Sequence, residues 1–141
     1  MFLRFHAQAR RVFKPGGIIA EWCYAHCNVV AEVDAVCATP YSDVLGAFWP
    51  PERVHVENGY AQLEFPFERL STPEVQMCAA WDLHQYLAYL ESWSALQRFR
   101  RDRGSDPLAV LNSDFMRSWG DPYQAREVRW QLSVRAGRLP E

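Results

Sequence analysis

The segment Lys14-Pro15-Gly16-Gly17 constrains the fold more than any other part of the sequence. Proline cannot continue a helical hydrogen-bond ladder, and glycine readily takes the left-handed conformation that closes a helix. The run that follows, residues 18–24, is apolar at every position except Glu21. A nearly continuous apolar run of this length is typical of a strand covered on both faces, as in a parallel sheet. Helix, tight turn and buried strand together predict the second half of an α/β unit.

Helical periodicity flanks this strand on both sides. Apolar residues three to four apart predict a helix from Phe2 to Phe13, and the same spacing recurs over residues 29–49. Thr39-Pro40 is expected to divide the second pattern into two helices, with Thr39 as the cap and Pro40 in the first turn. Residues 52–72 are predicted to be irregular, with Asn58-Gly59 as a possible hairpin turn.

The second half of the chain predicts two more strands. Residues 75–81 alternate as in a strand, and Asp82, with Gln85 as its capping-box partner, opens a helix that runs to about residue 97. Asp106-Pro107 opens a further helix that ends at Gly120. Residues 128–136 alternate strictly, which predicts an antiparallel strand at or near a sheet edge with its arginines in water.

The composition fits one globular domain over residues 1–141. Hydrophobic residues make up 49% of the chain, and 15 Lys and Arg against 17 Asp and Glu give a net charge of -2. This balance lacks the basic footprint of nucleic-acid binders and of proteins that bind anionic membranes, so neither partner is expected. No run approaches the roughly 18 apolar residues of a membrane span. Because the start does not look like a secretory signal, a cytoplasmic location with reduced cysteines is expected.

Three chemical constellations have simpler explanations. Cys23-x-x-His26-Cys27 resembles half of a zinc site, but the second Cys or His pair that structural zinc sites use is missing from the sequence. A cysteine nucleophile next to His26 or His84 has no carboxylate placed to orient the histidine. Glu21, inside a buried strand, is expected to pair with an arginine rather than to act in catalysis.

Five motifs, taken in order, resemble class I S-adenosylmethionine-dependent methyltransferases. Residues 9–20, Ala-Arg-Arg-Val-Phe-Lys-Pro-Gly-Gly-Ile-Ile-Ala, are similar to the family's turn into its fifth strand. The order of the other four resembles the branch that contains trans-aconitate methyltransferase: Phe48–Arg53, Phe65–Phe67, Tyr89–Ala95 and Trp119–Pro122. The resemblance covers essentially the whole chain and corresponds to the C-terminal half of such an enzyme.

The resemblance implies an α/β fold with part of a seven-stranded sheet. This chain would supply about three strands packed with helices: the fifth, of the buried parallel type, at Gly17–Tyr24, and the last two at Val75–Trp81 and Val128–Ala136. The four preceding strands and their glycine-rich cofactor loop would be absent. The seven glycines form no Gly-x-Gly, so the chain alone is not expected to bind S-adenosylmethionine, the family's cofactor.

The expected function follows from that departure. Methyl transfer depends on holding donor and acceptor in line, so a chain without the donor site is not expected to be competent alone. Two alternatives are an acceptor-recognition subunit of a split methyltransferase and a small dimeric binding or scaffold protein. Candidate acceptor-binding residues are Tyr24 and His26, at the carboxyl end of the fifth strand, together with Trp22, Trp49, Tyr86 and Trp93.

A homodimer is the expected assembly. If the strand Gly17–Tyr24 lacks its usual neighbour, its edge presents unpaired N–H and C=O groups on an apolar strand. Neither lysine nor proline interrupts residues 18–24, so nothing in the sequence protects this edge. Two copies are therefore expected to meet through these edges or through the adjacent hydrophobic helices.

Overall fold

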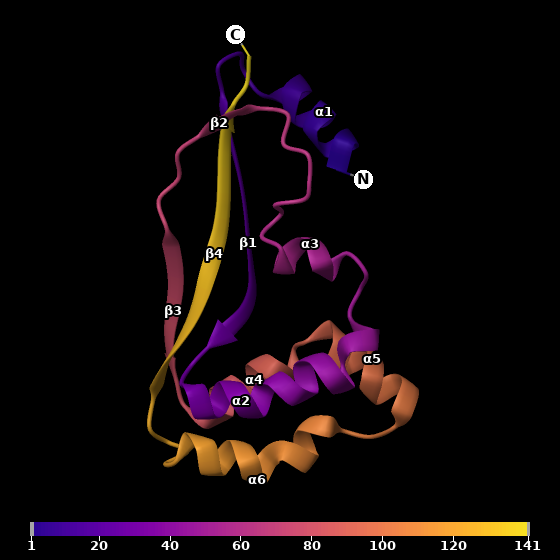
Figure 1. The fold of residues 1–141 in the computed structure, drawn as a ribbon, viewed down its shortest axis with the longest axis vertical. Coiled ribbons are helices and arrows are strands. Elements are labelled where there is room, and N and C mark those ends of the chain that lie inside the picture. Colours follow the sequence, from indigo (N-terminus) through magenta and orange to yellow (C-terminus); the bar gives the residue numbers. More distant parts are fainter. Residues whose placement is uncertain (1, 141) are drawn as a thin grey trace. The chain divides into compact units, whose positions relative to one another are not determined.

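The structure is a computed structural model that describes residues 2–140, and the side chains from Arg4 onward. Figure 1 shows its helices and strands. In chain order the elements are α1 (Phe2–Val12), β1 (Ile18–Asn28), α2 (Ala31–Thr39), the π-helix η1 (Pro40–Val44), the 3-10 helix η2 (Gly46–Phe48), α3 (Arg53–Glu57), β2 (Glu68–Leu70), β3 (Val75–Trp81), α4 (Leu83–Glu91), α5 (Ser94–Arg103), α6 (Pro107–Trp119) and β4 (Arg126–Arg138).

The four strands form one sheet around β4. The strand order is β1-β4-β2, and β3 also pairs with β4. β2 is antiparallel to β4, with Glu68 opposite Arg138 and Leu70 opposite Ala136. The β1 side runs antiparallel too, because Gly17 bonds to Leu139 and Glu21 to Arg135. The mixed α/β class is therefore confirmed, with four strands where about three were predicted.

β1 differs from its prediction as a buried strand of the parallel type. It is antiparallel to β4, and its residues alternate between exposed and covered. Ile18, Trp22 and Tyr24 are 54%, 62% and 44% exposed, whereas Ile19 and Cys23 on the other face are buried. The apolar run reflects two apolar faces, but within the described residues only one of them is covered. β4, predicted near an edge, lies between β1 and the β2 and β3 strands.

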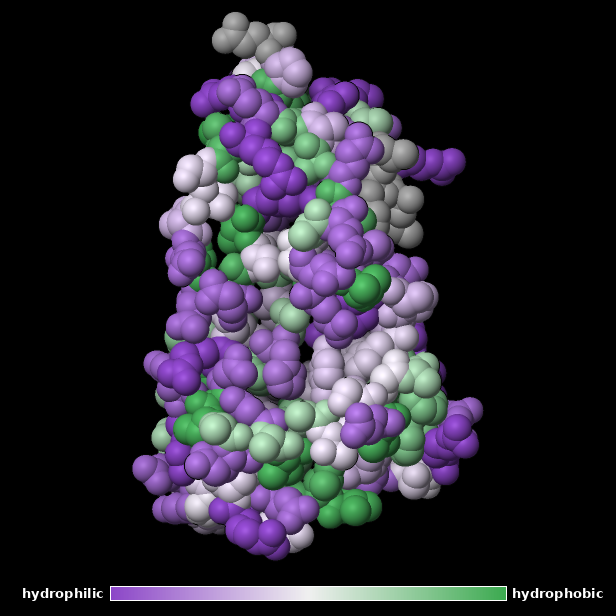
Figure 2. All heavy atoms as spheres, in the orientation of Figure 1, coloured by the Kyte–Doolittle hydropathy of each residue, from purple (hydrophilic) through white to green (hydrophobic). Residues whose placement is uncertain are grey.

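The contacts group the chain into two compact units. Unit 1 comprises the residues up to His26, Glu52–Met77 and those from Trp130 onward. Unit 2 comprises Cys27–Pro51 and Cys78–Arg129. Figure 2 shows one face of the molecule, on which groups of hydrophobic residues are exposed between hydrophilic residues. The single domain expected over residues 1–141 stays a prediction.

Unit 1 is built around the carboxylate of Glu21, whose side chain is 12% exposed. Glu21 of β1 accepts a hydrogen bond from Nε of Arg135 at 2.8 Å and lies 2.7 Å from Nε2 of His6 on α1. Nη1 of Arg135 also donates to the backbone carbonyls of Tyr60 and Leu63, at 2.8 and 2.9 Å. His6 and Arg135 are both buried. The arginine partner predicted for Glu21 is confirmed, but the prediction that Arg135 faces water is wrong, because it closes this cluster.

An apolar layer covers the same face of unit 1. Ala9, Ile19, Phe65, Phe67 and Leu139 form its core. A Cβ at Gly137 would lie 2.7 Å from both phenylalanine side chains, so only glycine lets these rings approach the strand. The rings in turn lie edge-on to the imidazole of His6. The aromatic layer therefore shields the ion pairs from water.

The loop from Asn58 onward is not a hairpin. Residues 53–57 form the short helix α3, and Gly59 and Tyr60 then take left-handed conformations, with φ of 56° and 62°. A Cβ at Gly59 would lie 2.4 Å from Oγ of Ser133. The Asn-Gly pair thus ends a helix close against β4, where the close approach requires a glycine.

Unit 2 is a group of packed helices. α2 packs on α6 and η1, and α5 packs on η2. The predicted capping box is present: Asp82 accepts from the backbone of Gln85, and the Gln85 side chain accepts from the backbone of Asp82. Asp106 caps α6, which ends at Gly120 as predicted. Tyr86, Phe115 and Trp119 are fully buried at its centre.

Two helix boundaries in unit 2 differ from the predictions. Thr39 is helical and Pro40 does not start a new α-helix. Proline has no N–H to donate to the preceding turn, and the chain continues as a π-turn in which the N–H of Leu45 donates to the Pro40 carbonyl. The single long helix expected from Asp82 is two helices, α4 and α5. Trp93 between them is extended, with ψ of 126°, and its side chain turns inward.

The pairing of Glu21 with Arg135 predicts the effect of removing the arginine. Arg135→Met should destabilise the protein by roughly 3–5 kcal/mol, because it leaves the largely covered carboxylate of Glu21 without its arginine. Urea unfolding followed by circular dichroism measures the loss. The double variant Glu21→Leu with Arg135→Met should regain most of it.

Arg138→Met is the matched control for this prediction. Arg138 is an exposed arginine of the same strand, and it donates only a 3.4 Å bond to the Gly16 carbonyl. Its replacement should change the free energy of unfolding by less than about 0.5 kcal/mol. Equal losses for the two single variants would contradict the assigned role of Arg135.

Candidate functional site

Five aromatic side chains of unit 2 come together from separate segments. We call them the aromatic cluster: Tyr41, Trp49, Trp81, Tyr89 and Trp93. Trp93 lies at the centre, with ring centroids 5.3 Å from Tyr41, 5.5 Å from Trp49 and 6.2 Å from Tyr89. Trp81 continues the row, 5.5 Å from Tyr89. These separations are those of edge-to-face and offset ring contacts.

Local backbone features hold the aromatic cluster in place. The extended conformation of Trp93 breaks the helix and turns its indole inward. Ser92 secures that break by donating from Oγ to the Tyr89 carbonyl at 2.6 Å. Nε1 of Trp49 donates to the Tyr41 carbonyl at 3.1 Å, which fixes the orientation of that indole. The helix break that the periodicity missed is therefore the feature that assembles the cluster.

The aromatic cluster is only partly covered. Trp93 is buried, whereas the other four rings are half-buried. Ring faces and edges at a surface can bind a flat apolar group by stacking, or a cation through the ring quadrupole. The cluster can therefore hold and orient a ligand.

The predicted site residues separate into three groups. Trp49 and Trp93 lie together in the aromatic cluster. Tyr86 is fully buried, with its ring 5.5 Å from that of Trp119, and is a core side chain. Trp22 and Tyr24 lie on the exposed face of β1 in unit 1, and Tyr24 contacts the ring of Trp130. His26 is half-buried near the end of that strand.

Sequence reasoning missed Tyr41, a neighbour of Trp93, and Trp81, a neighbour of Tyr89. Tyr41 lies in the π-turn, which no periodicity indicated. Trp81 is the last residue of β3 and directly precedes the Asp82 cap. The rule that selected Tyr24, a position at the carboxyl end of a strand, would also have selected Trp81.

The cysteines of the described residues lie apart from one another along the chain and the strand. Cys23 and Cys27 are four residues apart on an extended strand, which separates them by about 13 Å. Across the described part of the chain, no three His, Cys, Asp or Glu side chains gather as ligands of a metal ion would. The half-site suggested by the Cys-His-Cys spacing therefore has no partner there.

Burial makes three of the thiols poor nucleophiles. It raises the pKa of Cys27 to about 12 and that of Cys37 to about 11, with the Tyr86 hydroxyl nearby only partly offsetting the effect. Burial also raises the pKa of Cys23, against the opposing charges of Arg135 and Arg53. Cys78, in contrast, is exposed. A buried cysteine nucleophile is thus disfavoured.

The arginines of α5 are largely engaged with neighbouring groups. Arg100 lies 2.6 Å from Asp106 and 3.6 Å from Glu91, and its hydrogen bond to Asp106 raises its pKa. Arg103 pairs with Asp102 at 3.1 Å. Arg98 donates to the Phe48 carbonyl at 3.4 Å. This run is a solvated face in which most charges have partners.

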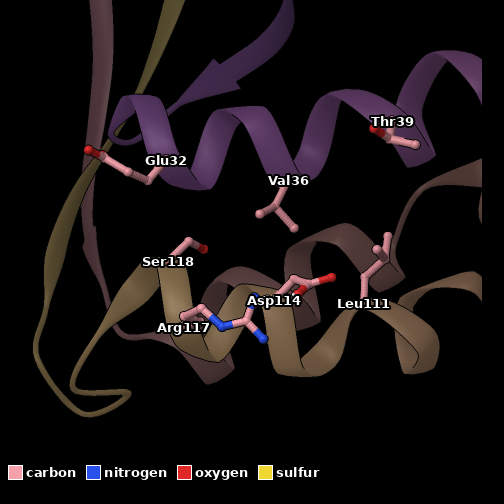
Figure 3. A pocket seen from close by; sticks show the side chains of 7 residues that line it. All are labelled: Glu32, Val36, Thr39, Leu111, Asp114, Arg117 and Ser118. Carbon is pink, nitrogen blue, oxygen red and sulfur yellow. Dashed lines mark hydrogen bonds and ion pairs between the residues drawn. The ribbon is translucent and has the colours of Figure 1, made fainter.

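A shallow hollow lies between α2 and α6. Figure 3 shows that Val36 and Leu111 point into the space between the two helices, with polar side chains around them. The hollow measures about 440 Å³. Arg117 pairs with Asp114 at 3.0 Å, which neutralises two of the charged groups. Its lining thus presents apolar side chains with one further acid, Glu32, at the rim.

Comparison with known proteins places this geometry in a family context. A solved structure described as a putative type II methyltransferase, from Anaeromyxobacter dehalogenans, superposes with a TM-score of 0.91 at 42% identity. The match covers 99% of this chain and 60% of that chain. This chain is methyltransferase-like. A putative methyltransferase of Dictyostelium discoideum is 20% identical over 118 residues.

The methyltransferase-like chain spans only part of these relatives. It covers 60% of the solved bacterial chain and 45% of the Dictyostelium protein. No protein-family model matches it. No helix among the described residues has the length and apolar character that a membrane crossing requires.

The thiol environments predict an order of chemical reactivity. At pH 8, Ellman's reagent should modify Cys78 promptly, because reaction needs the thiolate and the other three thiols are buried with raised pKa values. Those three should react only after unfolding in urea. Cys78→Ser should abolish the prompt phase, and a prompt reaction of the folded Cys78→Ser protein would contradict these environments.

Proposed function

We propose that this chain is the acceptor-side part of a class I S-adenosylmethionine-dependent methyltransferase, of the branch that contains trans-aconitate methyltransferase. The superposition over 99% of the chain at 42% identity supports the methyltransferase part of this proposal. The branch is supported by the order of the sequence motifs at Phe48–Arg53, Phe65–Phe67, Tyr89–Ala95 and Trp119–Pro122.

We propose that no turn from a strand to a helix in this chain holds the donor nucleotide. Open α/β sheets hold a nucleotide on a glycine-rich turn between a strand and the next helix. Here β1 leads into α2 through Val29-Val30, and β3 leads into α4 through Asp82. Neither turn contains glycine. The chain on its own is therefore proposed to lack a site for S-adenosylmethionine.

The left-handed glycines serve other purposes. Gly104 and Gly120 close α5 and α6, Gly59 follows α3, and Gly16 precedes β1. Each of these four has a positive φ and lies at a helix end or a turn into a strand. None lies in a turn that leads from a strand to a helix, so none is placed to let a backbone approach a phosphate.

The aromatic cluster is the proposed acceptor surface. It contains two of the predicted residues, Trp49 and Trp93, and its half-buried rings can orient a flat or cationic acceptor. Holding the acceptor is the share of methyl transfer that this part of the fold can contribute, since the reaction depends on alignment with the donor. Catalysis then requires a donor-binding part.

The second candidate function is that of a subunit whose donor-binding part lies on a separate polypeptide. The match leaves 40% of the bacterial chain without a counterpart, since it covers 60%, and a separate polypeptide would supply that share. In this case the chain would act as the acceptor-recognition subunit of a split methyltransferase in the cytoplasm. The two candidates are a methyltransferase part that stays inactive and a subunit of a split enzyme. Only the second is expected to gain activity when a donor-binding polypeptide is added.

Calorimetry tests the missing donor site. Titration of the 141-residue protein with S-adenosylmethionine should show no saturable heat up to about 1 mM ligand, because the chain is proposed to lack a donor site. A dissociation constant above 1 mM corresponds to a binding free energy weaker than about 4 kcal/mol. Tight binding by the chain alone would overturn the proposal. Methylation that appears only after addition of a donor-binding polypeptide would favour the split form.

Nuclear magnetic resonance with flat probes tests the acceptor surface. Benzylamine and benzoate should shift resonances of the aromatic cluster, and Trp49→Ala should weaken binding about 2- to 10-fold, the factor for one lost ring contact of about 0.5–1.5 kcal/mol. Tyr123→Ala is the matched control, since Tyr123 is a highly exposed ring. An equal loss in both variants would contradict a site at the aromatic cluster.

A further inference from the structure

We infer that the hollow between α2 and α6 binds a small aliphatic amine, that is, an apolar chain that ends in an ammonium group. Its volume of about 440 Å³ is in the range of ligand pockets, which are concave, mostly apolar and lined by few polar groups. Both helices belong to unit 2, so the site lies within one compact unit. It does not rest on the proposed function, because the rings of the aromatic cluster do not line it.

One face of each helix lines the hollow, because the lining side chains are three or four residues apart. On α2 they are Glu32, Val36 and Thr39, and on α6 they include Leu111, Asp114 and Ser118. Glu32 and Thr39 are two helical turns apart, so the hollow extends about 10 Å along α2. An elongated chain of methylene groups matches this shape.

The apolar side chains of the hollow are only partly covered. Val36 and Leu111 point into the space between the helices (Figure 3), and both are half-buried. Val33 and Phe115, of the same two helices, are in contrast fully buried. An alkyl chain lying over Val36 and Leu111 would remove their remaining apolar surface from water together with its own.

Charge favours a cation as the occupant. Asp114 accepts from Arg117 through Oδ1 alone, at 3.0 Å, and its side chain is 42% exposed against 78% for that of Arg117. Glu32 has no ion-pair partner within the described part of the chain. It lies in the first turn of α2, where the helix dipole favours the ionised carboxylate. The lining thus carries one net negative charge, which an ammonium group complements and an anion opposes.

The hydrogen-bonding groups of the rim favour the same occupant. Apart from Arg117 and the Thr39 hydroxyl, the polar side chains of the lining offer a ligand only acceptors. The hydroxyl proton of Ser118 is already donated to the Phe115 carbonyl at 3.1 Å, which leaves its oxygen lone pairs. The two carboxylates are acceptors as well, and an ammonium group has three donors and no acceptor. A carboxylate ligand would meet acceptors where it needs donors.

Nuclear magnetic resonance with matched alkyl probes tests this site. Hexylammonium should shift the methyl resonances of Val36 and Leu111 until they saturate. Hexanoate has the same apolar chain with the opposite charge, and should bind about 3-fold more weakly or worse. Butylammonium should bind about 3- to 15-fold more weakly than hexylammonium, because two fewer methylene groups leave water.

Charge variants separate the ammonium site from unspecific apolar binding. Glu32→Gln should weaken hexylammonium binding about 2- to 5-fold, the factor for one exposed ion pair, without weakening hexanoate binding. Glu127→Gln is the matched control, since Glu127 is an exposed acid of unit 2 that pairs with Arg129 and does not line the hollow. Asp114→Asn should lower the preference for hexylammonium over hexanoate further, because it also frees the guanidinium of Arg117.

A filling variant gives a second measurement. Val36→Phe should abolish the saturable shift of Leu111, whereas Val110→Phe, the same change at a 78% exposed position of α6, should not. If Val36→Phe does not fold by circular dichroism, the charge variants decide. Equal affinities for the two charged probes, no saturation up to about 20 mM hexylammonium, or unchanged binding in folded Val36→Phe would each overturn the inference. Shifts confined to the aromatic cluster would also overturn it, while leaving the proposed acceptor surface intact.

Discussion

A single carboxylate organises unit 1. Glu21 shares one oxygen with His6 of α1 and the other with Arg135 of β4. Arg135 in turn binds the backbone of the loop that follows α3. Since charges buried from water are costly unless fully paired, the helix, the two strands and the loop are each required by the others. The same arrangement draws the charge of β1 to one face and leaves the opposite face apolar.

Much of the local structure could be predicted from short-range signals, whereas the long-range pairings could not. The Asp82 capping box, the start of α6 at Pro107 and its end at Gly120 follow from neighbouring residues, and all are present. That Glu21 would pair with an arginine also follows from its burial. Which arginine does so could not be predicted, because Arg135 is 114 residues away and alternates with apolar residues like an exposed side chain.

The candidate site shows the same division. Trp49 and Trp93 were selected from sequence, but their contact depends on a helix break at Trp93 and a π-turn at Pro40. Both are departures from regular helix, and apolar periodicity alone does not detect them. The aromatic cluster thus arises where the helices of unit 2 are interrupted, while the regular elements supply the core around Tyr86.

Arg135 contacts the loop that follows α3 through main-chain and side-chain atoms. Its guanidinium donates to the carbonyl oxygens of residues 60 and 63 and lies over the Tyr60 ring, 5.5 Å from the ring centroid. The side chain of Leu63 can therefore change without loss of these contacts, whereas a change of Tyr60 removes the ring contact. The positions that cannot vary freely are the ones without a side chain, Gly59 and Gly137, where the main chain packs too closely for even a methyl group. Around Arg135 the fold therefore requires the absence of a side chain at two positions and an aromatic ring at two others, Tyr60 and Phe65.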